Sequence, residues 1–384
     1  MKVLYTTGHA LWVAENGKAT ELPSYRELRY RETIRQLSES KAWKTSGRGA
    51  QFMGVAEVQP KPEDASVSFG GIAAEKDGFL YTITLDASSG IYRRNFSERC
   101  DPEGHIVSGN DFRPSAIAIR ENDLAAVLHH PNGQAHIGLY HLPRAACTEL
   151  TDGDSCELDP FWSADGSRLL FSTCGIARGG VGDIIYGPSS AVVYHVHTQK
   201  METLLEDDKT DFRAPKEDAA GNLYFIRQPY TQHTNEEEVS ILDILKDVLL
   251  FPFRLVKAIF GFLNVFSIMF GREPLQSGGI GRDTKAKQKS EREMFLEDAR
   301  MSIESSGKKG KMTDGEDFYP ASRVLVRKAP DGTEEILAKS VMDYCLCSDG
   351  VVYSTGSRIL HRQNDGTVTE ITKAKYAMRL QAVE

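Results

Sequence analysis

The sequence predicts an all-β fold: a six-bladed β-propeller that is closed by pairing of its N- and C-terminal strands and has an α-helical insertion in the fifth blade. Short apolar strands are separated by Asn-Gly or Asp-Gly turns, the strongest local signal of a β-hairpin. The turns are regularly spaced, because Gly332 and Gly366 are 34 residues apart. Two hairpins in roughly 35–45 residues make one four-stranded blade.

Length and composition indicate a chain that buries a large core. It has 384 residues, of which 40% are hydrophobic, and this excludes global disorder. Forty-six Lys and Arg against 54 Asp and Glu give a net charge of −8, so nucleic acid is not expected as a partner. Six scattered cysteines make no disulfide framework, and the polar start does not resemble a signal peptide. We expect a cytoplasmic protein.

The blades can be placed in order along residues 1–384, which we interpret as one domain. The first blade joins 377–383 to 2–22, and this pairing would remove two exposed sheet edges. The other five blades cover 69–109, 112–151, 157–207, 210–340 and 341–374. Each blade is too small to bury its own faces, so the blades must stack side by side.

The fourth blade has the clearest repeat motif, Asp159-Pro160-Phe161-Trp162-Ser163-Ala164-Asp165-Gly166. We interpret Asp159 and Asp165 as turn-capping residues and Trp162 as a core residue between blades. The motif resembles the TolB-type, WD-like β-propeller repeat. This resemblance implies that the segment is an innermost strand with its following turn, and it implies a fold without implying a function.

Three long segments interrupt the repeat: 23–68, 174–190 and 231–320. By the strand assignment all three emerge on one face of the propeller, whereas the opposite face keeps tight Asp-Gly turns. Because binding residues concentrate on loops that a rigid scaffold positions, this face is the predicted functional face.

The segment 231–320 is predicted to contain an amphipathic helix at 241–271, followed by a flexible linker. Its polar residues recur at helical spacing on a mostly apolar cylinder. A helix lying in a membrane interface is the favoured interpretation, and packing on a protein or spanning a membrane are the alternatives. The residues predicted to contact a membrane or partner are Leu250, Phe251, Phe253, Arg254, Lys257, Phe260, Phe262, Phe266 and Phe270.

The segment 23–68 is predicted to contain a basic helix and a loop. Ser24 with Glu27 three residues later forms a capping-box pattern at the start of this helix. Leu28, Ile34 and Leu37 are expected on its buried side. An anion could bind its four arginines, which are Arg26, Arg29, Arg31 and Arg35. A solvated helix face is the alternative interpretation.

No catalytic motif is present, because the sequence contains neither a GxSxG nucleophile turn nor an HExxH metal motif. We therefore assign no catalytic residue, cofactor or metal. His129, His130, His136 and His141 fall on one predicted hairpin, where surface or hydrogen-bonded histidines are more common than metal ligands.

These observations predict a non-enzymatic scaffold. It would bind a membrane surface at the inner face of the membrane, bind a membrane-associated protein, or self-associate, in each case through 241–271. The alternative is a propeller enzyme or ligand-binding protein with a site at the central mouth of the insertion-bearing face. Convergence of Asp, Arg and His from several blades at that mouth would favour the alternative. No small-molecule ligand can be named from the sequence.

Overall fold

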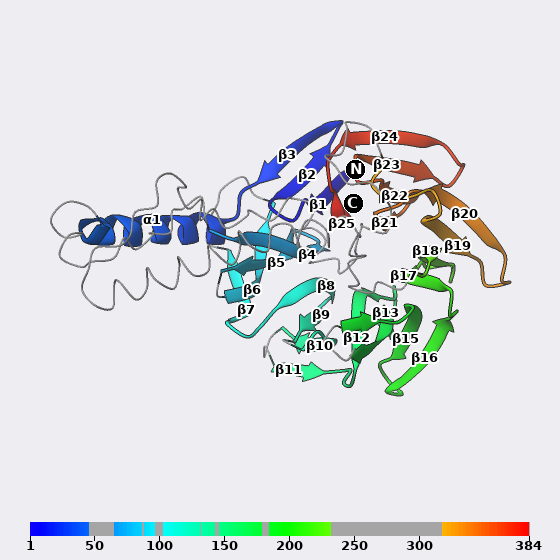
Figure 1. Cartoon of the computed structure of the whole chain (residues 1–384). Coiled ribbons are helices and arrows are strands. Elements are labelled where there is room, and N and C mark those ends of the chain that lie inside the picture. The colour runs from blue at the N-terminus through cyan, green and yellow to red at the C-terminus, as the bar shows by residue number, and fades with distance from the viewer. Residues whose placement is uncertain are drawn as a thin grey trace, which may run out of the picture. The chain divides into compact units, whose positions relative to one another are not determined.

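The computed structural model describes residues 1–45, 65–86, 88–96, 103–130, 132–142, 146–178, 184–231 and 317–383. In these ranges nearly all regular structure is β-strand, and the one helix is α1 (Tyr25–Thr45) (Figure 1). All of these elements belong to one structural unit, Met1–His233 with Met294–Glu384. The predicted helix at 241–271 lies outside the described residues.

The first sheet contains strands from both ends of the chain. Its order is β25-β1-β2-β3, made of β25 (Met378–Val383), β1 (Lys2–Thr6), β2 (Leu11–Glu15) and β3 (Lys18–Leu22). Lys2 pairs with Val383 and Leu4 pairs with Gln381, which places β25 beside β1 (Figure 1). The pairing of terminal strands that the sequence predicts is therefore present.

Three further sheets are four-stranded and antiparallel, with strands in chain order. One consists of β4 (Val67–Glu75), β5 (Gly78–Leu85), β6 (Ser88–Asn95) and β7 (Gly104–Gly109). Another consists of β17 (Thr210–Glu217), β18 (Leu223–Pro229), β19 (Val324–Lys328) and β20 (Glu334–Lys339). The third consists of β21 (Asp343–Cys347), β22 (Gly350–Ser354), β23 (Arg358–Gln363) and β24 (Val368–Lys373).

The remaining nine strands form one sheet that divides into two antiparallel groups. The first group is β8 (Pro114–Arg120), β9 (Asp123–His129), β10 (Ala135–His141) and β11 (Ala146–Glu149). The second is β12 (Ser155–Trp162), β13 (Arg168–Arg178), β14 (Ile184–Tyr186), β15 (Ser190–His195) and β16 (Lys200–Leu205). A single parallel pairing, Ala135 with Cys156, joins the groups.

Consecutive sheets pack face to face through buried hydrophobic clusters. Leu4 and Leu11 of the first sheet cluster with Phe69 and Ile83 of the next sheet, and similar clusters link each later group to its neighbour. A further cluster unites Ile359 and other residues of β21–β24 with residues of β1 and β25. This is a propeller-like arrangement, in which each sheet buries its two faces against its neighbours.

Most first strands of the sheets contain a β-bulge, and the exception is β21, which pairs with β22 without a register shift. The register of β12 shifts between Leu158 and Phe161, and the register of β17 shifts between Arg213 and Lys216. Comparable shifts occur in β4, in β8 and where β25 pairs with β1. A bulge inserts an extra residue and changes the direction of the side chains beside it, and bulges are frequent near functional sites.

Part of the segment 174–190, which was predicted to interrupt the repeat, forms regular strand structure. Strand β13 continues to Arg178, and its end pairs with β14, so that Ile176 lies opposite Tyr186. The reason is that Ile176, Ile184, Ile185 and Tyr186 have the β-branched or aromatic side chains that favour a strand. The irregular part of this segment is therefore shorter than predicted.

Candidate functional site

The charged side chains of Asp159, Arg213 and Arg379 come from three different sheets and meet at one point. The Nη1 atom of Arg379 on β25 donates a hydrogen bond to Asp159 Oδ1 at 2.5 Å. The Nε atom of Arg213 on β17 lies 3.9 Å from Asp159 Oδ2. The three side chains are between 17% and 23% exposed, so this charge cluster is largely shielded from solvent.

The bulges of the first strands create this meeting point. Asp159, Ala214 and Arg379 each lie at a bulge and each have a positive φ, at 53°, 50° and 56° respectively. Positive φ is uncommon for residues other than glycine, and strained backbone of this kind clusters at sites that the surrounding structure holds in place. The same local conformation therefore recurs in three first strands.

The electrostatics of the cluster favour the charged forms. Burial would raise the pKa of the Asp159 carboxyl, but the charges of Arg379 and Arg213 hold it below its usual range. Burial alone would lower the pKa of the Arg213 guanidinium, but the charges of Asp159 and Asp211 raise it. The pKa of Arg213 therefore lies above its usual value. Asp159 is therefore a carboxylate between guanidinium groups.

Lys216 adds a further cation to the cluster. Its Nζ atom donates a hydrogen bond to the carbonyl oxygen of Tyr344 and lies 4.5 Å from the centre of the Tyr344 ring. The Tyr344 hydroxyl in turn donates to the carbonyl oxygen of Ala214 at 2.6 Å. These contacts tie β21 to the bulge of β17, and the cation–π geometry helps to hold Lys216 in place.

A polar network extends the cluster along β17. Asp211 accepts hydrogen bonds from the backbone N–H of Ser189 at 2.8 Å and from the amide of Gln228 at 3.0 Å. Gln228 accepts a hydrogen bond from Arg323, which also donates to the carbonyl oxygen of Val341 at 2.6 Å. Arg323 is only 6% exposed, and burial lowers its pKa.

Arg213 differs from the buried cations Lys216 and Arg323 because it lacks a hydrogen-bond acceptor within the described ranges. Its guanidinium makes no hydrogen bond with the residues that the structure describes, and its buried Nε atom has no acceptor. Buried polar groups are normally hydrogen-bonded, and a guanidinium matches the two oxygens of a carboxylate or phosphate. The four cations Arg213, Arg379, Lys216 and Arg323 outnumber the three acids Asp159, Asp211 and Asp343, the last of which accepts a hydrogen bond from Leu380 N. Chemically, this arrangement can accept a small anion.

This cluster was not predicted from the sequence, in which Asp159 was interpreted as a turn-capping residue. That interpretation is wrong, since Asp159 lies in a bulge and pairs with Arg379. The interpretation of Asp165 is correct, because its carboxylate accepts hydrogen bonds from Ser167 N at 3.1 Å and Ser163 Oγ at 2.5 Å. Trp162 is 8% exposed and belongs to a buried cluster between neighbouring strand groups, as predicted.

The four predicted anion-binding arginines lie on α1, where two of them pair with glutamates. Arg31 pairs with Glu27 at 2.8 Å, and Arg35 pairs with Glu32 at 2.8 Å. The guanidinium of Arg26 lies 6.0 Å from the ring of Tyr92, and that of Arg29 lies 5.7 Å from the ring of Tyr25. Anion binding by these arginines remains a prediction.

The expected buried side of α1 is wrong. Leu28 is 49% exposed and Leu37 is 53% exposed, whereas Tyr30 packs against the core and donates a hydrogen bond to Asp86 at 2.5 Å. The reason is that the helix is polar on nearly all sides, so no apolar stripe directs its packing. The predicted N-cap is correct, because Glu27 N donates to Ser24 Oγ at 3.2 Å.

The predicted membrane- or partner-contacting residues between 250 and 270 lie outside the described residues. Within the described ranges, no helix has both the length and the apolar composition to span a membrane.

Cys347, Asp349 and His361 form a second group of chemically capable side chains. The Cys347 Sγ atom lies 3.6 Å and the Asp349 Oδ1 atom lies 3.1 Å from the same atom, His361 Nε2. A nucleophile–base–carboxylate relay uses the two ring nitrogens of histidine separately. This group therefore lacks the geometry of a catalytic triad.

No family model and no curated protein matches the chain. Similar solved structures include TolB from Acinetobacter baumannii, at 10% identity and a TM-score of 0.49, with 99% of this chain and 65% of that chain covered. The periplasmic gluconolactonase of Pseudomonas aeruginosa is similar at 9% identity and a TM-score of 0.41, with 100% and 99% covered. The chain thus spans 65% of the length of the Acinetobacter TolB. These similar structures are β-propeller proteins.

Proposed function

We propose that the chain is a six-bladed propeller, closed by β25 and β1, that binds a small anionic ligand at the charge cluster around Asp159, Arg213 and Arg379. The sheet order and the hydrophobic cluster between β21–β24 and the first sheet support the closed ring. The buried Nε atom of Arg213, which has no hydrogen-bond partner among the described residues, carries the ligand proposal, because an unpaired buried polar group costs about 1–3 kcal/mol and an anion would relieve that cost.

The ligand class follows from the donors. Arg213 and Arg379 are guanidinium groups that reach one carboxylate from different strands, and Lys216 adds an ammonium group. Planar guanidinium groups bind carboxylate or phosphate oxygens in pairs. A ligand that carries at least one carboxylate or phosphate group fits this donor set. The convergence of Asp and Arg from several sheets favours ligand binding over a scaffold with an uncharged centre.

Titration of the full chain with inorganic phosphate or with succinate tests the proposal at constant ionic strength. We expect one of these anions to raise the unfolding temperature of the wild-type chain, because a ligand that binds only the folded state stabilises it. Arg213→Met should weaken binding by roughly 10- to 150-fold, since a hydrogen bond to a charged group contributes about 1.5–3 kcal/mol.

Arg227→Met is the matched control. Arg227 lies on β18 of the same sheet and pairs with Glu334 at 2.7 Å, outside the charge cluster. This variant should bind as the wild type does. Equal stabilisation of the Arg213→Met and wild-type chains would contradict the proposal. A response to phosphate without a response to succinate would identify the phosphate class, and the reverse would identify the carboxylate class.

A second proposed function rests on the sequence of 241–271. Five phenylalanines lie between 253 and 270, with Arg254 and Lys257 among them, which is the composition of an interfacial helix. We propose that this segment attaches the protein to the inner face of a membrane or to a membrane-associated protein. The two proposals are independent, because they concern different residues.

Deletion of residues 235–315 tests the membrane proposal. The full chain is expected to sediment with vesicles that contain phosphatidylglycerol, and the deletion variant should bind at least tenfold less. Basic residues near an anionic surface contribute about 1 kcal/mol each, so a double Arg254→Glu, Lys257→Glu variant should also lose affinity. Unchanged vesicle binding by the deletion variant would exclude this proposal.

A further inference from the structure

Three possible metal ligands lie on one face of the β8–β11 group. His136 on β10 pairs with Leu128 on β9, and His130 follows Leu128 by two residues. Glu149 on β11 pairs with Gly138, which follows His136 by two residues. Because side chains alternate along a strand, the register places His130, His136 and Glu149 on the same face as diagonal neighbours.

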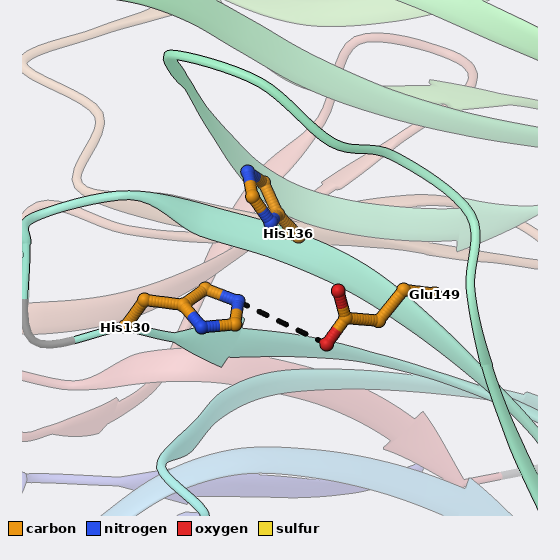
Figure 2. A group of neighbouring side chains, drawn as sticks. All are labelled: His130, His136 and Glu149. Atoms are coloured by element: carbon orange, nitrogen blue, oxygen red, sulfur yellow. Dashed lines mark ion pairs between the residues drawn. The ribbon is translucent and has the colours of Figure 1, made fainter.

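Gly138 lies between His136 and Glu149 on this face, and its neighbours fill the space above it. A Cβ atom at Gly138 would lie 2.7 Å from the side chain of Leu128 and 3.0 Å from Cys147 Sγ. A larger residue would therefore displace Leu128 or Cys147 beside the three ligands. Figure 2 shows the His130 ring directed toward the Glu149 carboxylate, with the His136 ring beside them.

The distances between the possible ligand atoms of His130, His136 and Glu149 are close to those in a metal site. His130 Nε2 lies 4.0 Å from Glu149 Oε1, and one ligand atom of each residue lies within 4.8 Å of the other two. The two imidazole rings have centroids 4.8 Å apart. Zinc–nitrogen and zinc–oxygen bonds of about 2.0–2.2 Å place tetrahedral ligands about 3.4 Å apart. Side-chain rotations that move these atoms by about 1 Å would bring them to bonding distance.

A hydrogen bond holds the His136 ring in the way that is typical of metal-binding histidines. His136 Nε2 lies 3.0 Å from the carbonyl oxygen of Gly153, so this nitrogen must carry the proton and donate. The other nitrogen, Nδ1, then has a free electron pair. Metal-bound histidines typically make this contact with a backbone carbonyl through the second ring nitrogen. His130 Nε2 is a buried atom without a hydrogen-bond partner, so it too can bind a metal ion.

We propose that His130, His136 and Glu149 bind a divalent transition-metal ion of the zinc class. Two imidazoles and a carboxylate suit zinc or a neighbouring metal better than calcium or magnesium, which prefer oxygen ligands. Glu149 is 49% exposed at its side chain, whereas His136 is 6% exposed. The site is therefore open to solvent on the glutamate side, and a water molecule or a ligand atom can take the fourth position.

The second candidate cluster, Cys347 with Asp349 and His361, fits a metal less well. Cys347 Sγ and Asp349 Oδ1 both contact His361 Nε2 directly. A metal ion would have to compete with them for this nitrogen. This cluster serves as an internal comparison in the experiment, because it lies in a different sheet and offers a thiol, a carboxylate and one imidazole.

Equilibrium dialysis of the metal-free full chain against Zn²⁺ tests the proposal, with Co²⁺ absorption as a second readout. We expect each chain to bind one Zn²⁺ ion. Bound Co²⁺ should give the visible absorption bands of a site with a low coordination number. His130→Ala, His136→Ala and Glu149→Gln should each weaken zinc binding at least about tenfold, since even outer ligand partners contribute 10- to 100-fold. The variants at His130 and Glu149 are informative even where the buried His136 is needed for folding.

His141→Ala is the matched control. His141 lies on the same strand but on its opposite face, and it pairs with Asp123 at 2.9 Å. This variant should bind zinc as the wild type does. The proposal is overturned by a wild-type chain that binds no zinc, by loss of binding in His141→Ala equal to that in His130→Ala, or by binding that disappears only in Cys347→Ser.

Discussion

Replacement of Asp159 by Asn is expected to lower the free energy of unfolding by about 3–5 kcal/mol, because removal of one partner of a buried ion pair leaves the other charges uncompensated. Arg379 would lose its 2.5 Å hydrogen bond to a charged acceptor, and Arg213 would lose the counter-charge that lies 3.9 Å from its Nε atom. Asn is close in size to Asp and tolerates the positive φ of 53° at this position. The change in the free energy of unfolding therefore reflects the loss of the negative charge. Urea unfolding at pH 7 measures it.

A double-mutant cycle separates the ion pair from other effects of the substitution. Arg379→Met alone should also destabilise the fold, but the double variant should be less destabilised than the sum of the two single variants by about 1–3 kcal/mol. Simple additivity of the two changes would show that Asp159 and Arg379 do not interact in solution.

The pH dependence of stability provides a second check on Asp159. The folded-state pKa of its carboxyl is lowered, so its contribution is fully present above the unfolded value of about 3.9. The contribution is lost as the pH falls through the lower folded-state pKa. Below pH 4 the wild type should therefore lose more stability than Asp159→Asn, and the two curves should converge in acid.

Replacement of Glu103 by Ala is expected to lower the free energy of unfolding by about 2–4 kcal/mol, because this carboxylate caps α1. Its two oxygens accept hydrogen bonds from the backbone N–H groups of Tyr25 and Arg26, each at 3.0 Å. The Tyr81 hydroxyl also donates to it at 2.5 Å, and Tyr81 is fully buried. The substitution removes the charged acceptor of the Tyr81 hydroxyl and of two N–H groups at the positive end of the helix, and Ser24 Oγ, 2.8 Å from that hydroxyl, remains beside them.

Glu39→Ala is the control for the loss of a negative charge near this helix. Glu39 pairs with Arg35 at 3.4 Å on an exposed surface, and exposed pairs of this kind contribute about 0.5 kcal/mol or less. Circular dichroism should show a loss of helix signal in Glu103→Ala but not in Glu39→Ala. Equal unfolding midpoints for the two variants would contradict the capping role.

Much of the strand pattern could be predicted because its signals are local. Gly17, Gly166, Gly332 and Gly366 all have positive φ, which is what a tight hairpin turn requires. The segments on either side of them form the expected strands. The prediction of a buried stripe on α1 failed because α1 is a polar helix, fixed at its start by Glu103, a residue far away in the sequence.

The charge cluster could not be predicted from local signals. Asp159, Arg213 and Arg379 are separated by many residues, and only the packing of three sheets brings them together. A weaker signal was present, since Pro160 and Pro215 each follow the residue with positive φ in a first strand. Within sheets, proline is confined to edges and bulges, so these two prolines marked the bulges.

The placement of β25 beside β1 has a consequence for biosynthesis. While the chain emerges from the ribosome, β1 cannot pair with β25 until residues 378–383 have been synthesised. During that interval β1 presents unpaired N–H and C=O groups, which can pair with strands of other nascent chains. Protection of this edge during translation, for instance by a chaperone, would therefore matter more for this protein than for one whose sheets are completed in order.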